Sequence, residues 1–417
     1  LDIAQKLDSG YDRIFQLLQD TEFTEQKLVN TAEDFGELLD RHLLWIRSSK
    51  PVDIRDIHKL RVSLGWFFNP ANWDQLFRDL GRSFHQKSAI WIIGLLIGLF
   101  LIVSRRWSRR KLKDIAECVG QQVEDSFLLT MKALGLTVVL AAFWPFLLVF
   151  PAIQLMSLHQ AGPFSTGIAG GLINATLPLI SMVLFYNICR QNGLAQTHFQ
   201  WPESVRRTLR RNLGWLAPIV AVSSIFLGTM ATVSLFEFSD ALAKLALMVQ
   251  TLAISIFAAH ILRFRGGITS GSIEKHPQSW LCRLRYVWYP LAILVPLFIL
   301  CLALIGYFYS AIELRNLVRD TIVLLSALVV FNDLVLRMLV LARRRVALKK
   351  AIAKQELYQE STSGADPGSD ARSALMGTVI EMSDIDEQTR KLLKLVLFIL
   401  VLLGIWAIWE PVFPAFG

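Results

Sequence analysis

Long apolar runs separated by short polar segments dominate the chain from residue 88 onward. A helix needs roughly 20 mostly apolar residues to cross a hydrocarbon core of about 30 Å, and tilt or snorkelling allows for longer or shorter runs. Eight runs meet this requirement, at residues 88–103, 133–153, 164–189, 213–236, 241–262, 287–309, 317–341 and 392–409. The pattern therefore predicts an all-α, polytopic helical membrane protein with about eight transmembrane helices.

Lysine and arginine are distributed unequally between the connecting segments. Segments 105–132, 190–211, 263–285 and 342–391 together contain 26 of these residues, whereas the other connections and the tail contain only Arg315. Because basic loops are retained on the cytoplasmic side, both ends of the chain are predicted to be periplasmic. The net charge of +9 is then explained by membrane topology, and no nucleic-acid partner is expected.

Residues 1–64 have the pattern of a helical segment outside the membrane. Apolar residues recur at steps of three and four from Ile3 to Leu18 and again from Leu28 to Ile46, as in two amphipathic helices. We expect a helical hairpin that packs on itself, on further helices or on a neighbouring subunit. Because each helix has only one apolar stripe, this segment is predicted to be the end of a larger periplasmic domain.

Residues 65–87 are predicted to form an amphipathic helix in the outer membrane interface. Asn72 and Gln75, just after Pro70, have the spacing of a capping box. Aromatic side chains of such a helix normally lie at headgroup depth, and packing within the outer domain is the alternative. The predicted interfacial anchors are Trp66, Phe67, Phe68, Trp73 and Phe77.

Two basic clusters adjoin the predicted spans on the cytoplasmic side. Such clusters attract anionic lipid headgroups, and a merely solvated helix end is the alternative. The predicted headgroup contacts are Arg105, Arg106, Arg109, Arg110, Arg343, Arg344 and Arg345. Segment 342–391 is predicted to be a basic, flexible linker, because Gly, Ser, Pro and acidic residues replace apolar ones around 360–370. It precedes the last span, and residues 410–417 form a short periplasmic end.

The predicted spans contain few ionisable residues, and the candidates for a functional role are Lys244, His260, Asp333 and Arg337. Asp333 and Arg337 are four residues apart and share a helix face, so an intramembrane ion pair is expected. An ion or proton path is the alternative. Lys244 is expected to reach the outer headgroups. The GxxxG spacings at Gly94 and Gly98, and at Gly167 and Gly171, favour close helix contacts.

Sequence motifs of soluble enzymes are absent. The chain contains no GxxxxGK[ST], HExxH, CxxC or GxSxG motif. An intramembrane enzyme needs a nucleophile and base or a set of metal ligands, and the seven scattered histidines suggest no such set. We expect no enzymatic activity, no catalytic or metal site and no cofactor.

Four segments carry a resemblance to a known family: LLDRHLLWIRSSKPV at 38–52, GWFFNPANW at 65–73, LVLARRRVALKKA at 339–351 and DIDEQTRKLLKL at 384–395. With them the chain resembles the membrane region of the large MscS-like mechanosensitive channels of the Gram-negative inner membrane, the MscK/MscM group. The resemblance implies a homoheptamer with a periplasmic helical domain, outer transmembrane helices, a pore-forming group and a cytoplasmic vestibule.

On this resemblance the chain is expected to be the tension-sensing transmembrane region of an ion channel that opens on membrane stretch in hypoosmotic shock. Its expected partners are membrane lipids, further copies in a homo-oligomer, and ions that cross a pore outside this chain. The predicted spans have no row of polar residues to line a water path. Two alternatives remain: a secondary transporter with a midplane site near Asp333, and a membrane scaffold without transport.

Overall fold

The computed structural model describes residues 13–28, 31, 47–51, 55–118, 126–158, 160–233, 239–263, 285–361, 388, 391–410 and 412–413. Within these residues the regular structure is entirely helical, which confirms the predicted all-α class. Eight of the described helices are long and apolar enough to cross a membrane. They are α4 (Ser88–Cys118), α5 (Phe127–Met156), α6 (Pro163–Ile188), α8 (Glu203–Thr232), α9 (Ser239–Ile261), α12 (Arg285–Ile305), α13 (Phe308–Ser361) and a last helix at Lys391–Trp409.

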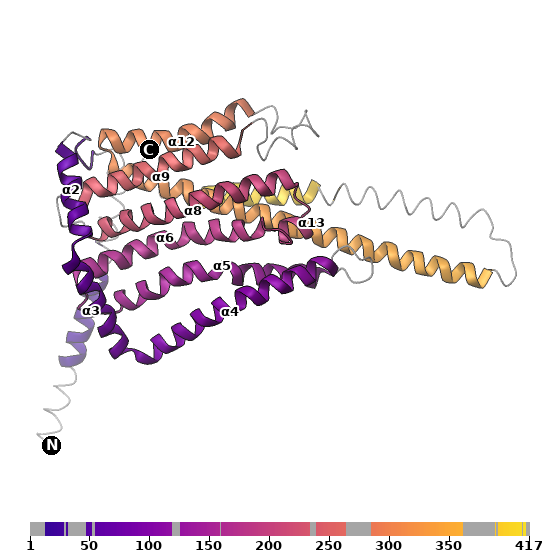
Figure 1. The fold of residues 1–417 in the computed structure, drawn as a ribbon, viewed down its shortest axis with the longest axis horizontal. Coiled ribbons are helices and arrows are strands. Elements are labelled where there is room, and N and C mark those ends of the chain that lie inside the picture. The colour runs from indigo at the N-terminus through magenta and orange to yellow at the C-terminus, as the bar shows by residue number, and fades with distance from the viewer. Residues whose placement is uncertain are drawn as a thin grey trace, which may run out of the picture.

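The membrane-spanning helices lie side by side, and most pack on the preceding long helix in the chain (Figure 1). α13 crosses behind this row, because it contacts α12 and also α5, where Val330 joins the apolar cluster around Leu140. The last helix lies against α13: Trp409 Nε1 donates to Thr321 Oγ1 at 3.2 Å. α13 therefore connects α12, α5 and the final span.

The contact between α6 and α8 depends on small residues. A Cβ added at Gly171 would lie 2.4 Å from the carbonyl oxygen of Ile225, and one added at Gly228 would lie 2.8 Å from the Cα of Gly171. The GxxxG spacing at Gly167 and Gly171 thus lies at a close helix contact. Gly94 instead faces an aromatic ring, since an added Cβ would lie 2.1 Å from Phe150.

Two helices extend well beyond the apolar runs. α4 continues to Cys118, so the basic residues expected in a loop from 105 onward lie on its final turns. α13 contains 54 residues, or about 80 Å of helix, and therefore includes the first part of the predicted linker at 342–391. Neither Gly nor Pro occurs between Phe308 and Ser361. Hydropathy marks the edge of the bilayer, whereas a helix continues until a helix-breaking residue or unfavourable composition ends it.

Helices α2 (Arg55–Phe67) and α3 (Pro70–Gln86) lie across one end of the row (Figure 1). α2 contacts α9, and α3 contacts α4, α5 and α6. The single helix predicted at 65–87 is thus interrupted, and Asn69, not Asn72, caps α3 by accepting a bond from the Ala71 amide at 3.1 Å. Further upstream, residues 13–28 are helical and exposed, whereas most of the second helix predicted for the hairpin lies outside the described residues.

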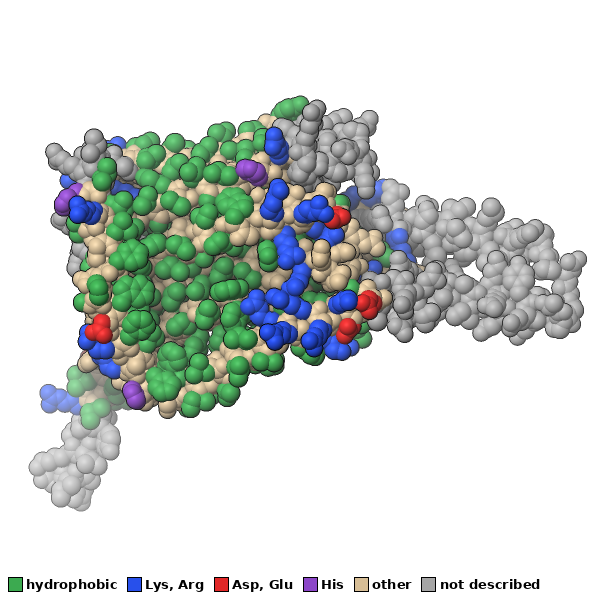
Figure 2. Space-filling view, in the orientation of Figure 1, with side chains coloured by type: hydrophobic (Ala, Val, Ile, Leu, Met, Phe, Trp, Pro, Cys, Tyr) green, Lys and Arg blue, Asp and Glu red, His purple; other side chains and the backbone are tan. Residues whose placement is uncertain are grey.

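The visible face of the bundle has a clear polarity (Figure 2). Lysine and arginine gather at the end opposite to α2 and α3, and apolar side chains cover the region between. Burial also varies between helices: half of the apolar window of α8 and 56% of that of α9 are buried, against 6% for α13 and none for the last helix. A compact centre of the row is therefore flanked by spans whose apolar side chains face outward.

Candidate functional site: the outer joint and an intramembrane polar network

The outer joint consists of α2, α3, residues 47–51 and the helix ends that they contact. At its centre Asp79 of α3 is fully buried. Its Oδ2 accepts bonds from the Gly162 amide at 3.0 Å and the Ser165 hydroxyl at 2.6 Å, and its Oδ1 pairs with Arg82. Gly162 is the N-cap of α6 and has no side chain to cap it. The carboxylate therefore supplies the cap from another helix, where the helix dipole favours negative charge.

The five aromatic residues predicted as interfacial anchors separate into two groups. Phe67 is only 6% exposed, and its ring centroid lies 4.7 Å from Phe226 and 5.8 Å from Phe164. Trp66 and Trp73 also contact Phe164, at centroid distances of 5.3 and 5.5 Å. Phe68 and Phe77 are 63% and 64% exposed. Three of the five therefore pack inside the protein, which was the alternative interpretation, and the exposed pair retains the anchor role as a prediction.

A second contact of the outer joint lies at the turn between α12 and α13. The amide and hydroxyl of Ser49 both donate to the Gly306 carbonyl, at 3.1 and 3.2 Å, and the Tyr309 amide donates to Ser48 Oγ at 2.9 Å. Lys244 was expected to reach the lipid headgroups, but its Nζ donates to the Lys50 carbonyl at 2.9 Å. The chain before α2 is thus bound to α9 and to the start of α13.

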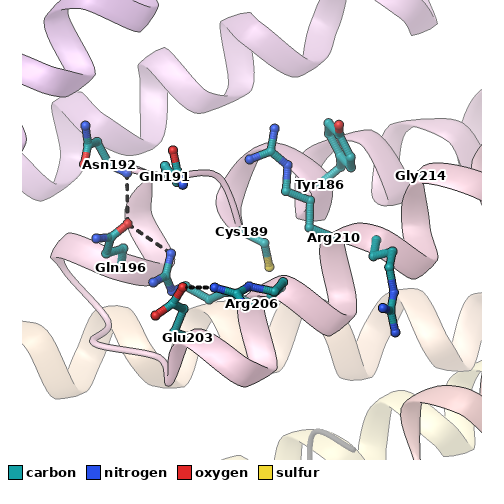
Figure 3. Close-up of a pocket in the computed structure, with 11 residues that line it drawn as sticks. Tyr186, Cys189, Gln191, Asn192, Gln196, Glu203, Arg206, Arg210 and Gly214 are labelled. Atoms are coloured by element: carbon teal, nitrogen blue, oxygen red, sulfur yellow. Dashed lines mark hydrogen bonds and ion pairs between the residues drawn. The ribbon is translucent and has the colours of Figure 1, made fainter.

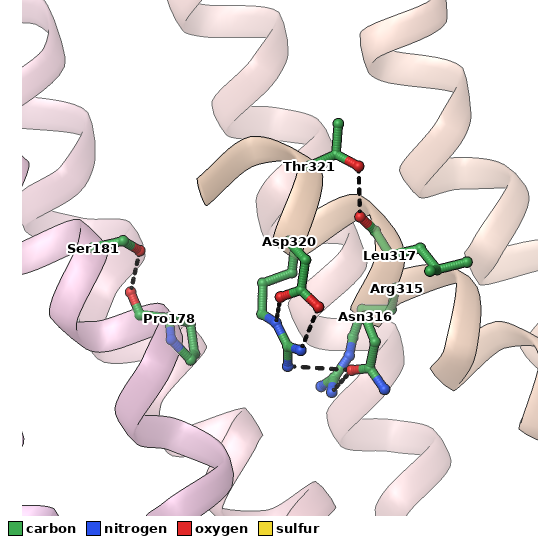
Figure 4. A network of polar contacts seen from close by, with 8 residues as sticks. Pro178, Ser181, Arg315, Asn316, Leu317, Asp320 and Thr321 are labelled. Carbon is green, nitrogen blue, oxygen red and sulfur yellow. Dashed lines mark hydrogen bonds and ion pairs between the residues drawn. The ribbon is translucent and has the colours of Figure 1, made fainter. Parts of the chain in front are cut away.

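A polar network crosses the bundle between α6, α8, α9 and α13. Arg315 is 7% exposed; its Nη1 donates to Gln250 Oε1 at 3.0 Å and its Nη2 to Asn316 Oδ1 at 2.7 Å. Gln250 Nε2 donates to the Ser224 hydroxyl at 3.0 Å. Figure 4 shows Arg315 and Asn316 one turn from Asp320, whose carboxylate binds Arg319 at 2.8 Å. Asn174 of α6 donates to the Ser224 carbonyl at 2.9 Å, so hydrogen bonds connect four helices beside one ion pair.

This network lies near the middle of the membrane-spanning region. Gln250 follows the first residue of α9 by eleven positions, which corresponds to about 16 Å of helix, or half of a 30 Å hydrocarbon core. Sequence reasoning placed Arg315 in an outer loop and omitted Arg319 and Asp320 from the intramembrane residues. The sequence does indicate that this helix begins earlier than the apolar run. No Gly or Pro occurs between Gly306 and residue 361, so nothing prevents the helix from beginning near Phe308.

Asp333 has other partners than the one predicted. Its Oδ2 accepts a bond from Trp201 Nε1 at 2.7 Å, and its Oδ1 accepts one from Asn332 at 3.2 Å. Trp201 lies between the short helix α7 (Leu194–Thr197) and α8. The expected ion pair with Arg337 is not among the ion pairs of the described residues, because the indole provides a donor from a packed neighbouring segment. Asp333 thus connects α13 to the α7–α8 connection.

The predicted headgroup residues lie at the end of the bundle opposite to the outer joint. Arg106, Arg109 and Arg110 are exposed on α4, as are Arg343 and Arg345 on α13, while the side chain of Arg344 lies outside the described part. Arg105 is half-buried, with its guanidinium 5.0 Å from the ring centroid of Phe143. Lipid contact by this set remains a prediction. Among the described residues, no three His, Cys, Asp or Glu side chains are grouped to bind a metal ion.

Comparison with known families gives a match over most of the chain. The family model described as "mechanosensitive ion channel inner membrane domain 1" matches residues 88–417. These residues include all eight described helices that are long and apolar enough to cross a membrane. No solved structure matches the chain.

Three curated relatives are similar at low identity. The mechanosensitive channel MscK of Escherichia coli is 24% identical over 95% of this chain. The miniconductance mechanosensitive channel MscM of the same organism is 24% identical over 100% of this chain. An uncharacterized MscS family protein of Haemophilus influenzae is 23% identical over 83% of the chain. The chain spans 34%, 38% and 31% of these relatives, or about a third of each.

Proposed function

Because the chain belongs to the MscS-like family described as mechanosensitive ion channel inner membrane domain 1, we propose that it is the tension-sensing region of a channel that opens on membrane stretch in hypoosmotic shock. In this proposal it has no catalytic role, and its ends are periplasmic. Its partners are membrane lipids and further copies in a homo-oligomer, heptameric by the resemblance. Ions cross through a pore outside this chain.

The unequal burial of the spans is the observation that supports this proposal most directly. The apolar windows of α4 and α12 are 17% buried, that of α13 is 6% buried and that of the last helix is not buried at all. These spans offer apolar surface to lipid or to a second subunit. Lateral tension favours the conformation that occupies more area in the membrane plane, so outward-facing spans are the ones on which it acts.

The outer joint provides a route by which movement of one span affects others. It connects α6 through Asp79, α9 through Lys244 and the α12–α13 turn through Ser49. A change in the spacing of these helix ends must therefore rearrange the joint. A few kcal/mol of differential stability between two arrangements is enough to shift their populations by one or two decades.

Patch-clamp recording on the full-length protein tests the proposal. In cells lacking other stretch-activated channels, we expect currents that rise with graded suction. A Ser83→Cys/Gln154→Cys pair joins α3 to α5, where Ser83 Oγ donates to the Gln154 carbonyl at 3.4 Å. Its oxidation should raise the activation pressure and leave single-channel current unchanged, and reduction should reverse the effect. Each single-cysteine variant is the control, and assembled protein without pressure-dependent current would refute the proposal.

A secondary transporter is a second candidate, because Arg315 and its partners form a buried polar network near the midplane. The adjacent cavity measures only about 120 Å³, and apolar side chains form much of its lining. Such a cavity is small for most solutes. Gln250→Leu distinguishes the candidates: solute uptake in proteoliposomes that is abolished by this change and insensitive to tension would favour the transporter.

A further inference from the structure

A cavity of about 640 Å³ lies at the cytoplasmic ends of α6 and α8, away from the outer joint and the intramembrane network. We call it the arginine cavity. Four arginines of the first turns of α8 line it with a single carboxylate, that of Glu203. They are Arg206, Arg207, Arg210 and Arg211. Glu203 pairs with Arg207, so the cavity retains an excess of positive charge.

Two of these arginines are fixed by neutral contacts, as Figure 3 shows. Arg206 is 9% exposed; its Nη1 donates to Gln196 Oε1 at 3.0 Å and its Nε to the Trp201 carbonyl at 3.3 Å. The guanidinium of Arg210 lies 4.8 Å from the ring centroid of Tyr186 on α6. Arginines that only extend into solvent at a free helix end do not make such hydrogen bonds and ring contacts within the protein. Among the ion pairs of the described residues, none joins Arg206 or Arg210 to a carboxylate.

Neighbouring charges add to this imbalance. Arg190, in the turn after α6, has a pKa lowered first by burial and then by the charges of Arg109 and Arg210. Arg109 belongs to α4, so arginines from three segments face one region. Burial raises the pKa of the Cys189 thiol in the cavity wall to about 12, although Arg206 and Arg210 oppose that shift. The thiol is therefore protonated at neutral pH, and the cavity is not suited to thiolate chemistry.

We propose that the arginine cavity binds a phosphate group, with Arg206 and Arg210 as its principal contacts. Planar guanidinium groups bind phosphate oxygens bidentately, and the volume is within the range of small-molecule sites. Gln196 already accepts two bonds at Oε1, from Arg206 and from the Asn192 amide, which leaves its NH₂ as a further donor. The group belongs either to an anionic phospholipid headgroup or to a free cytoplasmic phosphate compound.

Such a ligand would act on α13 through one intervening residue. Trp201 accepts the bond from Arg206 at its carbonyl and donates from its indole to Asp333 on α13. A ligand that binds this arrangement preferentially stabilises it relative to any other. Occupancy of the cavity is therefore expected to hold α13 in its present position and, where the proposed function is correct, to raise the activation pressure.

Binding to the purified full-length protein tests the proposal without any channel measurement. The test variant is Arg206→Gln/Arg210→Gln. The matched control is Lys111→Gln/Lys113→Gln, which removes the same charge from exposed positions on α4 at the same end of the bundle. Native mass spectrometry in nanodiscs of phosphatidylglycerol or phosphatidylcholine measures retained lipid, and calorimetry with inorganic pyrophosphate in detergent measures binding of a free phosphate compound.

We expect at least tenfold weaker binding in the test variant and less than a threefold change in the control. Retention of phosphatidylglycerol would identify the lipid as the source, and pyrophosphate binding would identify a soluble compound. Equal losses in both variants, or no binding of either probe to the wild-type protein, would overturn the proposal. If the double variant fails to fold, Arg210→Lys preserves the charge but not the planar guanidinium, and should still weaken binding about threefold; unchanged binding there would also contradict it.

Discussion

The two ends of the bundle are built from opposite chemistry. At the outer joint, the buried charge of Asp79 is bound by Arg82 and by two donors at the start of α6, and aromatic rings fill the space beside it. At the opposite end, buried Arg206 is bound by neutral groups beside a cavity of about 640 Å³. The outer end is a closed contact between helices, whereas the inner end is suited to receive an anion.

This contrast matters for the tension-sensing role that we propose. A closed contact transmits displacement from one helix to another because its groups are satisfied only in one arrangement. The stability of an open cationic cavity depends on whether an anion is bound in it. The outer joint is therefore expected to set the mechanical coupling between helices. The other end is expected to make that coupling depend on which phosphate-bearing lipids or solutes are present. Substitutions at the two ends should therefore have different effects.

The largest effect is expected from Phe67→Ala, which empties the centre of the aromatic cluster. Loss of a buried Phe costs about 3–5 kcal/mol of folding free energy. The neighbouring Phe68, which is 63% exposed, is the matched control, and its replacement by Ala should cost less than about 1 kcal/mol. Thermal unfolding of the two purified variants measures this difference. Equal shifts would show that both rings have similar surroundings.

Asp79→Ala should be the next most damaging change. It removes the acceptor for the Gly162 amide and the Ser165 hydroxyl, and we expect a loss of about 2–3 kcal/mol, together with an altered activation pressure. Asp74→Ala is the control on the same helix, since Asp74 pairs with Arg78 at 2.7 Å while both side chains are about two-thirds exposed. That surface pair should contribute less than about 1 kcal/mol. Similar losses in both variants would argue against a capping role.

Gly306→Ala should weaken the other contact of the outer joint. Gly306 has a φ of +109°, and an added Cβ would lie 2.4 Å from the Ser49 carbonyl oxygen. We expect a cost of about 1–3 kcal/mol and faster tryptic cleavage after Arg47, because the segment detaches locally. Gly135→Ala on α5 is the control, as nothing lies within 4 Å of an added Cβ there. Unchanged cleavage after Arg47 would contradict this view of the joint.

The smallest effect on stability, but a clear chemical one, is expected at the inner end. Because burial raises the pKa of Cys189 to about 12, its thiol should react with a maleimide at pH 8.5 at least about tenfold more slowly than a thiol of ordinary pKa, since little thiolate is present. The control is Gln191→Cys in a Cys189→Ser background, with the remaining cysteines also replaced by Ser. Comparable rates would show that the wall of the arginine cavity opens to solvent.

Sequence patterns predicted the architecture well where many neighbouring residues share one property, such as hydrophobicity or positive charge. The eight apolar runs correspond to the eight long helices, and the 26 basic residues in alternate connections gave the polarity of the bundle. Family membership followed from short structural segments. Helix ends were predicted less accurately: α4 and α13 continue past the bilayer because basic residues are good helix formers, so the end of hydrophobicity is not the end of the helix.

Site residues could be predicted only where the chemistry is local. Trp66, Phe67, Phe68, Trp73 and Phe77 were recognised as an aromatic group, but periodicity cannot say which of them contact lipid and which contact Phe164 of another helix. Asp79 was missed altogether. Its partner Gly162 lies 83 residues away, and no pattern around position 79 distinguishes it from the exposed acid at position 74.

The sequence by itself determined that the chain is helical, that eight runs are long and apolar enough to cross a membrane, and that one end of the bundle is basic. Each of these properties depends only on residues that are neighbours in the sequence. Only the tertiary structure decided that Arg315 binds Gln250, that Asp333 binds Trp201 and that Asp79 caps α6. Lipid tails and apolar side chains are almost equivalent surroundings in a membrane, so composition cannot specify which helix covers which face. That choice depends on close packing and on hydrogen-bond partners brought together from distant parts of the chain.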